Sequence, residues 1–486
     1  MSVEGFEPVI GLEVHAQLQT HSKMFCPCSA AYSDAPPNTF VCAVCGGMPG
    51  ALPVINRKAV VYTVMVALAL HCTIAKHSKF DRKNYSYPDL PKGYQISQYD
   101  LPLAQDGWVE YDIQGHTFRC GITRVHLEED TGKSTHTRID GRDVSLVDYN
   151  RSGVPLLEIV SRPDIRAPEE ARQFFATLRQ ILMYLGVNDG NLQEGSLRAD
   201  VNVSLRRPGD SLPTSKVEIK NLNSFRSVRS SLEYEIERQR RLLDMGELIP
   251  QETRGWSEAR EVTVGQRSKE FADDYRYFPE PDLPPLVLDR RHIDYLASHL
   301  PELPQSRTRR FVEGYGLSQA QATVLTEDKE LADFYEATVV AATPAPPVMV
   351  ANWISGDTLG LLNDRKLSLA QSTLRPDRVG KLMLALRDET ISSAAGKRVL
   401  EEMLVAGEDP EYIIDHLNLR QVRDESELGR WVVDVLSSNP DLVLSYRAGR
   451  TNVLQHFVGQ VMKRSAGKAD PVRARQLLER RLSELD

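Results

Sequence analysis

The N-terminal part of the chain contains four segments in which hydrophobic and polar residues alternate with a period of two. Residues 11–18, 124–130, 199–205 and 216–221 read GLEVHAQL, RVHLEED, ADVNVSL and KVEIKN. This alternation predicts β-strands with one buried and one open face, because successive side chains of a strand point to opposite sides. A loop with Pro208, Gly209 and Asp210 joins the last two segments, so we expect them to pair as an antiparallel hairpin.

Helical periodicity predicts the other elements. Apolar residues recur every three or four positions over 168–186 and 225–246, and the stretch PEPDLPPL at 279–286 indicates a domain boundary. Beyond this stretch the pattern is almost wholly helical, with one long helix expected over 318–342 and a break at Gly407. We therefore expect an α+β protein: a mostly antiparallel sheet domain with flanking helices over 1–290, an all-α helical domain over 291–406 and an all-α tail domain over 407–486.

The composition is that of an ordinary globular protein. The chain has 486 residues, of which 41% are hydrophobic and 26% charged, and this excludes a disordered or collagen-like chain. The longest apolar run, at 59–70, is shorter than the ~20 residues that a membrane span needs. The N-terminal sequence MSVEGFEPVIG resembles neither a secretory signal nor a transit peptide. We expect a cytoplasmic protein without a membrane partner, whose cysteines stay reduced.

The net charge of −8 hides an uneven distribution. Residues 443–486 carry nine Lys or Arg and four Asp or Glu, which gives +5, so residues 1–442 carry −13. A local basic region on two expected helices is typical of a surface that contacts RNA phosphates. A solvated helix face is the alternative. The candidate RNA-binding residues are Lys463, Arg464, Lys468, Arg473 and Arg475.

Four of the six cysteines form two short pairs. Cys26 and Cys28 are one residue apart, and Cys42 and Cys45 follow as a second pair. Two such pairs around one ion suit tetrahedral zinc, and four thiolates leave no open position, so we predict a structural zinc site. The alternative is four unrelated buried thiols. Cys72 and Cys120 are expected to be ordinary buried residues.

The polar faces of the four predicted strands carry the residue types of a metal site. Three carboxylates and an imidazole on one sheet would repel unless a cation neutralised them, and oxygen-rich ligands of this kind suit Mg²⁺ or Mn²⁺. A sheet face that is simply solvated is the alternative. The candidate catalytic residues are Glu13, His15, Glu128 and Glu218. The candidate residues for a nucleotide or its phosphates are Arg124, Asp200, Asn202, Ser204 and Lys220.

Other motifs give weaker signals. The sequence TGKS at 131–134 resembles the end of a P-loop, but the glycine that this loop needs at position 127 is Leu127. No dinucleotide-binding or hydrolase motif is present in the sequence. The Tyr- and Pro-rich segment at 83–102 is either a lip that grips a base, an aminoacyl group or a chain end, or a loop packed by its own tyrosines.

Several longer motifs together resemble the B subunits of the tRNA-dependent amidotransferases. They are VIGLEVHAQL, VCGGMPGALPVIN, KNYSYPDLPKGYQISQ, LEEDTGKS, DYNRSGVPLLEIVSRPD, LQEGSLRADVNVSLR and VEIKNLNSFRSV. The C-terminal segment FVGQVMKRSAGKADPVRARQLLERRL resembles the tail domain of that family, which is shared with YqeY-type proteins. The resemblance spans almost the whole chain.

The resemblance implies a function. In this family an N-terminal cradle domain uses ATP and Mg²⁺ to phosphorylate the side-chain carboxylate of Glu-tRNA(Gln) or Asp-tRNA(Asn). Ammonia from the amidase (glutaminase) subunit then displaces the phosphate, and a small third subunit joins the other two in a heterotrimer. The metal-binding motifs of the family fall here on Glu13, His15, Glu128 and Glu218, with Glu129 as an alternative at the same motif as Glu128. The competing hypothesis is a non-catalytic, zinc-containing tRNA adaptor subunit.

Overall fold

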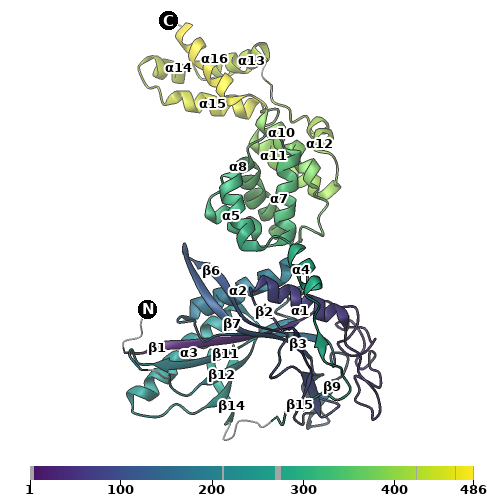
Figure 1. Cartoon of the computed structure of the whole chain (residues 1–486). Helices are drawn as coiled ribbons and strands as arrows, with labels where there is room; N and C mark the ends of the chain where they lie inside the picture. The colour runs from purple at the N-terminus through teal and green to yellow at the C-terminus, as the bar shows by residue number, and fades with distance from the viewer. Residues whose placement is uncertain (1–4, 211–212, 269–274, 423, 466, 485–486) are drawn as a thin grey trace. The chain divides into compact units, whose positions relative to one another are not determined.

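The computed structural model describes residues 5–210, 213–268, 275–422, 424–465 and 467–484 (Figure 1). The chain divides into two compact units, Met1–Leu303 and Pro304–Asp486. All described strands lie in the first unit, and the second is built of helices, which confirms the predicted α+β class.

A nine-stranded sheet forms the centre of the first unit. Its strand order is β14-β13-β12-β11-β1-β10-β7-β6-β2, and every pairing is antiparallel except that of β12 with β13. The predicted hairpin is confirmed as the antiparallel pair β11–β12. The strands are β1 (Glu7–Gln17), β2 (Thr73–Ile74), β6 (Ala104–Ile113), β7 (His116–Glu129), β10 (Pro155–Ser161), β11 (Leu197–Arg206), β12 (Val217–Leu222), β13 (Glu252–Ser257) and β14 (Val262–Ser268).

Three smaller sheets complete the strands of this unit. One has the order β15-β4-β5, and the pairs β16–β3 and β8–β9 form the other two. Their bounds are β3 (His77–Ser78), β4 (Asp81–Asn84), β5 (Tyr94–Ser97), β8 (Lys133–Ile139), β9 (Arg142–Asp148), β15 (Phe278–Pro279) and β16 (Leu286–Val287).

Helices cover the apolar face of the large sheet. The helices α1 (Arg57–Ala69), α2 (Pro168–Tyr184) and α3 (Phe225–Asp244) contact its strands and share one hydrophobic core with them. Helix α4 (Arg290–Ser298) adds Ile293 to the same core, so it belongs to the first unit although it follows the boundary predicted at 290. Because one face is covered in this way, the polar side chains of the strands are gathered on the other face.

The second unit contains two separate hydrophobic clusters, one between Phe311 and Ile414 and one between Leu428 and Leu482. The single helix expected over 318–342 is wrong: the segment forms two helices, because Asp328 caps a new helix by accepting from the N–H groups of Glu330 and Leu331. The helices are α5 (Pro304–Tyr315), α6 (Gln319–Thr326), α7 (Lys329–Ala341), α8 (Pro347–Asn352), the π-helix η1 (Trp353–Thr358), α9 (Leu359–Arg365), α10 (Pro376–Arg387), α11 (Ser393–Ala406), α12 (Pro410–His416), α13 (Glu425–Ser437), α14 (Pro440–Arg447), α15 (Val453–Arg464) and α16 (Pro471–Glu484).

No described helix combines the length and the apolar character that a membrane crossing requires. The domain boundary at 406 and the cytoplasmic location stay predictions.

An ion-pair cluster joins α5 to α7. Glu336 accepts hydrogen bonds from Arg307 Nε at 3.0 Å and from the Tyr315 hydroxyl at 2.9 Å, and Arg310 also pairs with it. Burial alone would raise the pKa of Glu336, but these hydrogen bonds hold that pKa at about 2. The ionised carboxylate therefore stabilises the fold at neutral pH.

Replacing this carboxylate should change stability in a pH-dependent way. We expect Glu336→Gln to lower the free energy of unfolding by about 1–2 kcal/mol at pH 7, a value that allows for solvent screening of a partly exposed group. Because the pKa is depressed in the folded state, the stabilisation is complete above pH 4.5 and is lost as the pH falls toward 2. Urea unfolding of both chains at pH 7 and pH 3 measures this difference, with the exposed Glu313→Gln as control. A deficit of equal size at both pH values would contradict the account.

Candidate functional site

The open face of the sheet carries polar side chains in rows that run across the strands. Strand register places His15 of β1 opposite Glu158 of β10 and Glu158 opposite His126 of β7, while Arg198 of β11 lies on the other side of His15. Directly opposed residues share one face of a sheet. One row therefore reads Arg198–His15–Glu158–His126, a carboxylate between two imidazoles with a guanidinium at the end.

The contacts within this row are short and buried. Glu158 Oε2 lies 3.5 Å from His15 Nε2 and 3.3 Å from His126 Nε2. Burial would raise the pKa of Glu158, but the neighbouring His126 and His15 hold it well below its usual range. Burial would lower the pKa of His15, and its hydrogen bond with Glu158 raises it instead. Glu158 therefore stays ionised.

Glu128 adds a second carboxylate to this cluster. It lies in the next row, and its side chain comes close enough that one ligand atom each of His15, Glu128 and Glu158 lie within 4.8 Å of one another. The hydroxyl of Ser97 on β5 donates to Glu128 at 3.2 Å. The Nδ1 atoms of His15 and His126 are buried and have no hydrogen-bond partner among the described residues. Two carboxylates and an imidazole in this arrangement can hold a divalent cation.

Glu13 lies one row away, in a second acidic group. It accepts from Asn202 Nδ2 at 2.9 Å and lies opposite Asp200. Burial and the nearby charge of Glu158 raise the pKa of Glu13. Glu218, opposite Asn202 on β12, accepts from the Thr253 hydroxyl at 3.0 Å and pairs with Lys220 at 3.2 Å. The four predicted residues Glu13, His15, Glu128 and Glu218 thus share one face, but only His15 and Glu128 belong to the three-ligand cluster, and Glu13 and Glu218 lie outside it.

The predicted phosphate-binding residues have different surroundings. Lys220 is held by Glu218 and Asp200, so its charge is already compensated. The Nε atom of Arg124 is buried without a partner among the described residues, and so is the Oδ1 atom of Asn202. The hydroxyl of Ser204 donates to the carbonyl of Val9 at 3.5 Å. Arg124 and Asn202 are therefore the members of this set with atoms left to bind a ligand.

Glu129 points away from the cluster. It has the same parity along β7 as the buried Leu127, and its carboxylate pairs with Lys92 and accepts from the Ile96 N–H at 2.9 Å. Of the two adjacent carboxylates that the sequence analysis left as alternatives, the structure brings only Glu128 together with His15 and Glu158.

Four residues on or near this face are absent from the predicted site residues: Glu158, Arg198, His126 and Lys83. Glu158 stands in the apolar run PLLEIVS, which shows no alternation, and Arg198 precedes its alternating segment. Lys83 on β4 belongs to the Tyr-rich segment, and its ammonium lies 4.9 Å from the centre of the Tyr275 ring. Burial would lower the pKa of Lys83, but Glu128 and other nearby acidic groups raise it. The alternating signal would have found His126, which lies in the same row.

The tyrosines of the segment at 83–102 pack largely on one another. Tyr85 lies edge-on to Tyr87 and Tyr275, with ring centres 5.9 and 5.8 Å apart, and its hydroxyl donates to Gln95 at 2.9 Å. Tyr99 stacks on Tyr277 with ring centres 4.2 Å apart. The self-packed alternative therefore describes these side chains well, while Ser97 of the same segment donates to Glu128, and the charge of Glu128 raises the pKa of Lys83.

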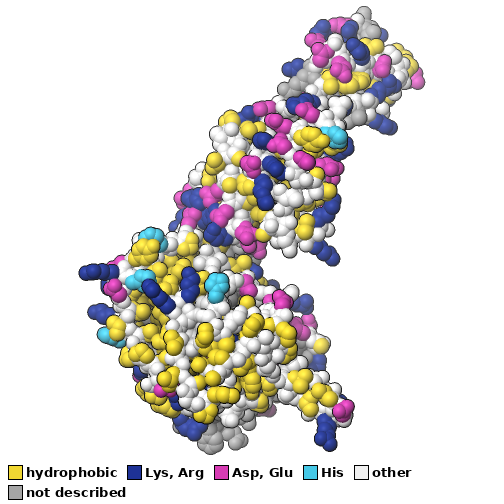
Figure 2. All heavy atoms as spheres, turned by 90° about the vertical axis from the view of Figure 1, so that its right-hand side faces the viewer, with side chains coloured by type: hydrophobic (Ala, Val, Ile, Leu, Met, Phe, Trp, Pro, Cys, Tyr) yellow, Lys and Arg dark blue, Asp and Glu magenta, His cyan; other side chains and the backbone are white. Residues whose placement is uncertain are grey.

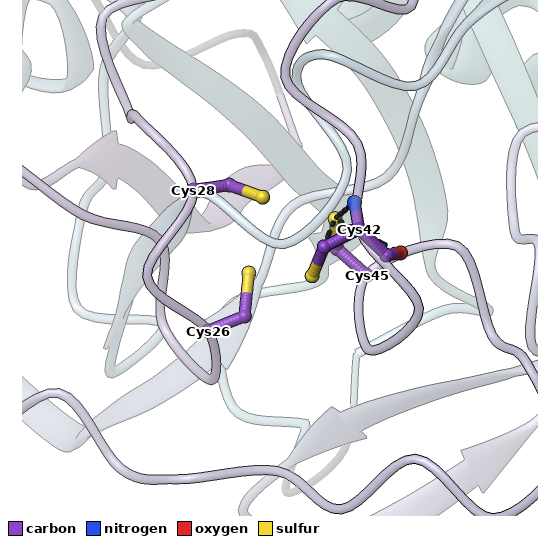
Figure 3. Close-up of side chains that lie close together, drawn as sticks. All are labelled: Cys26, Cys28, Cys42 and Cys45. Atoms are coloured by element: carbon purple, nitrogen blue, oxygen red, sulfur yellow. Dashed lines mark hydrogen bonds between the residues drawn. The ribbon is translucent and has the colours of Figure 1, made fainter.

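The four predicted zinc ligands come together at another place in the first unit. Figure 3 shows the sulfur atoms of Cys26, Cys28, Cys42 and Cys45 pointing toward one another from two loops, and all four lie within 4.8 Å of each other. The Sγ atoms of Cys42 and Cys45 are 3.9 Å apart, and four thiolates at ~2.3 Å from one zinc ion would be ~3.8 Å apart. These residues therefore fit the tetrahedral ion.

The thiols of this group differ in acidity. A hydrogen bond with Cys26 lowers the pKa of Cys45 to about 4, and burial raises the pKa of Cys28 to about 11. The Cys42 N–H also donates to the Cys45 sulfur at 3.2 Å. Cys72 and Cys120 are buried elsewhere, as predicted.

The basic residues of the tail lie on or between α15 and α16. Lys463, Arg464, Arg473 and Arg475 are exposed, and Lys468 is half-buried. Arg464 pairs with Asp434 at 3.3 Å and Arg475 with Glu479 at 3.1 Å. These weak surface pairs leave the side chains available to an anionic partner.

Comparison with known proteins gives consistent matches along the chain. Residues 8–294 match the GatB/GatE catalytic domain, and residues 333–482 match the GatB domain. The chain is 51% identical over 479 residues to the aspartyl/glutamyl-tRNA(Asn/Gln) amidotransferase B subunit of Thermomicrobium roseum, covering 99% of both chains. It is 50% identical to the proteins of the same name from Carboxydothermus hydrogenoformans and Dehalococcoides mccartyi, again over 99% of each chain.

The two adjacent carboxylates at the end of β7 can be separated by experiment. We expect Glu128→Gln to weaken Mn²⁺ binding to the purified chain at least tenfold, because the substitution removes a charged ligand atom from the three-residue cluster. Glu129→Gln is the matched control and should bind Mn²⁺ as the unmodified chain does. The free Mn²⁺ concentration in a titration, followed by electron paramagnetic resonance, measures both. Weaker binding by Glu129→Gln than by Glu128→Gln would contradict the assignment.

Proposed function

The chain belongs to the B-subunit family of the aspartyl/glutamyl-tRNA(Asn/Gln) amidotransferases, and on this premise we propose that it is the subunit that activates the misacylated tRNA. It is thus part of a multi-subunit, glutamine-dependent ligase. In the proposed reaction the γ-phosphoryl group of ATP is transferred to the side-chain carboxylate of Glu-tRNA(Gln) or Asp-tRNA(Asn). The observation that carries the proposal is the largely buried cluster of His15, Glu128 and Glu158 on the polar face of the large sheet.

The donor set of this cluster suits Mg²⁺. Two carboxylates and an imidazole leave coordination positions for water and phosphate oxygens, as Mg²⁺ sites in phosphoryl-transfer enzymes do. Glu13, in the next row, is a further candidate, because a cation would offset both the burial and the repulsion by Glu158 that raise its pKa. A bound Mg²⁺ would neutralise charge on the phosphates and orient them.

The cations around the cluster would supply the rest of the charge compensation. Phosphoryl transfer depends mainly on positioning and on neutralising the charge of the equatorial oxygens. The charge of Glu128 raises the pKa of Lys83, Arg198 flanks His15 and pairs with Asp130 at 3.5 Å, and Arg124 has a buried Nε without a partner among the described residues. We assign these three side chains to the phosphates, and Asn202 to orienting Glu13 through its hydrogen bond.

A cavity next to the acidic rows could seat the nucleoside. Its volume is about 330 Å³, which lies in the range of small-molecule sites. Gly11, Glu13, Asn202 and Ser204 are among the residues that line it, together with apolar side chains such as Val160. Gly11 adds no side chain to this lining, which Ser161 and Pro163 bound at that point. This arrangement would direct the phosphates toward Glu13 and the cluster.

The second half of the reaction needs ammonia from a partner. A carboxylate becomes a good electrophile once it is phosphorylated, and ammonia that displaces the phosphate yields Gln-tRNA(Gln) or Asn-tRNA(Asn). We propose that the amidase subunit releases this ammonia from glutamine and that the small third subunit joins the amidase to this chain. Figure 2 shows hydrophobic side chains gathered on the visible face of the first unit, and Met48, Leu52 and Val54 are more than 60% exposed. Such exposure is typical of a protein–protein interface.

We further propose that Cys26, Cys28, Cys42 and Cys45 hold a structural zinc ion. The mutual distances of the sulfur atoms support this assignment. With all four positions filled by thiolates, the ion would stabilise the two loops and take no part in the reaction.

The test of the catalytic proposal separates it from the adaptor hypothesis. We expect Glu13→Ala and Glu158→Gln to abolish ATP hydrolysis that depends on misacylated tRNA, in the complex with the partner subunits, because both residues belong to the acidic rows. Binding of tRNA should persist in both variants. An adaptor has no need of these residues, so unchanged ATP hydrolysis in both would reject the kinase assignment.

The basic tail should contribute to tRNA affinity without affecting ammonia release. Replacing its exposed basic residues with alanine should weaken binding and flatten its salt dependence, since fewer phosphate counterions are released. Glutaminase activity of the complex should stay the same. The variant changes Lys463, Arg464, Arg473 and Arg475, and its control changes the exposed Lys397 and Arg398 on α11. Equal affinity and an equal salt slope in both variants would rule out this role of the tail.

A further inference from the structure

Lys23 is a fully buried lysine beside the four cysteines. Its side chain is 1% exposed. The ammonium donates to the carbonyl oxygens of Phe40 at 2.7 Å and Tyr149 at 3.2 Å, and its third contact is the Cys45 sulfur at 3.5 Å. A lysine is almost never buried to this extent unless a partner compensates its charge. Of these three partners only the sulfur can carry a negative charge.

The backbone around Lys23 connects the same parts of the fold. Its N–H donates to the carbonyl of Cys28 at 2.9 Å, and the N–H of Met24 donates to the carbonyl of Gly153 at 2.7 Å. The two cysteine loops drawn in Figure 3 and the segment 149–154 therefore meet at one residue.

The charge of the metal site explains why a lysine stands here. Zn²⁺ with four thiolates has a net charge of −2, and burying this charge is unfavourable unless cations or N–H groups compensate it. We propose that Lys23 is a positioning residue of the four-cysteine site, which donates to the Cys45 thiolate and attaches the metal-bound loops to the segment 149–154. This inference rests on the proposed zinc ion.

Backbone hydrogen bonds also connect the segment 149–154 to the strands that carry the acidic cluster. The N–H of Gly153 donates to the carbonyl of Asp130 at 2.9 Å, and the N–H of Asp130 donates to the carbonyl of Val154 at 2.8 Å. Asp130 directly follows β7, which carries Glu128, and Val154 directly precedes β10, which carries Glu158. The loops around the cysteines thus brace the ends of two strands that position the proposed Mg²⁺ ligands.

A lysine whose only role was to donate to the carbonyl groups of Phe40 and Tyr149 would have a different effect on stability. It would stabilise the loops to the same extent with and without zinc. A lysine that compensates the thiolate stabilises mainly the zinc-bound form. The two roles can be told apart because only the second one depends on the metal.

The first experiment measures zinc release. Lys23→Met keeps the length of the side chain and removes the charge. We expect the purified full chain to contain one zinc ion, and Lys23→Met to release it to a chromogenic chelator 10–100 times faster, the usual effect of losing a hydrogen bond to a metal ligand. Lys92→Met is the matched control: Lys92 packs beside Gly47 after the second cysteine pair but pairs with Glu129 rather than with sulfur. It should release zinc at the rate of the unmodified chain.

Thermal unfolding gives a second readout. Lys23→Met should lower the melting temperature of the zinc-bound chain by more than it lowers that of the zinc-free chain. Equal zinc release, or an equal loss of melting temperature in both forms, would overturn the role of Lys23. Absence of zinc from the unmodified chain would instead reject the metal site itself, so the two failures are distinguishable.

A measurement on the unmodified chain covers the case in which Lys23→Met does not fold. Lys23 should resist an amine-reactive reagent in the zinc-bound chain and should react once zinc is removed, while the exposed Lys58 reacts in both states. Mass spectrometry of the labelled peptides gives the result. Protection of Lys23 that is the same with and without zinc would contradict the proposal.

Discussion

The polar face of the sheet depends on the buried carboxylate of Glu158. This side chain is about 9% exposed and lies between two imidazoles on neighbouring strands. An unpaired buried carboxylate costs several kcal/mol, so the contacts with His15 and His126 are a condition for folding this part of the sheet. A slip of one residue in either pairing would turn Glu158 toward the apolar core under the helices. The same interaction therefore fixes both the charge of the site and the register of its three central strands.

The remaining charges follow from this arrangement. Glu128 and Glu13 lie in the rows on either side, where like charges come close, and the cations Lys83 and Arg198 approach from elements outside the central three strands. Acidic and basic groups are thus interleaved within a small area. Atoms that lack partners among the described residues, such as Nδ1 of His15 and Nε of Arg124, lie in this area. Such an arrangement suits a ligand that carries both a cation and phosphate groups, because each of its charges finds a complement.

Much of this face could be predicted from the sequence, and the reasons for the exceptions are physical. The alternation in β1, β7, β11 and β12 identified Glu13, His15 and Glu128, because one side of each strand is covered by helices. Glu158 was not predicted as a site residue, because β10 is central and buried on both faces and its sequence therefore shows no alternation. Lys83 lies in a separate small sheet. A local sequence pattern does not show that it lies near Glu128, because only the tertiary fold brings the two residues together. The prediction of a single helix over 318–342 was wrong, because Asp328 caps a new helix within a segment whose apolar periodicity is continuous.

The end of β7 shows how closely the two proposed metal sites are connected. Strand alternation turns Glu128 toward the acidic cluster and Glu129 to the opposite face. Both are held by consecutive residues of β5, since Ser97 donates to Glu128 and the Ile96 N–H donates to Glu129. Gly153 has a positive φ of 87°, which strains any residue with a side chain, and a Cβ at this position would lie 3.4 Å from the Cys45 Cβ and 3.9 Å from Glu129 Oε2. A displacement of the cysteine loops would therefore reach Glu129 and β5 first, and Glu128 directly after them. The proposed structural ion would thus have a route to influence the proposed Mg²⁺ ligands without contacting them.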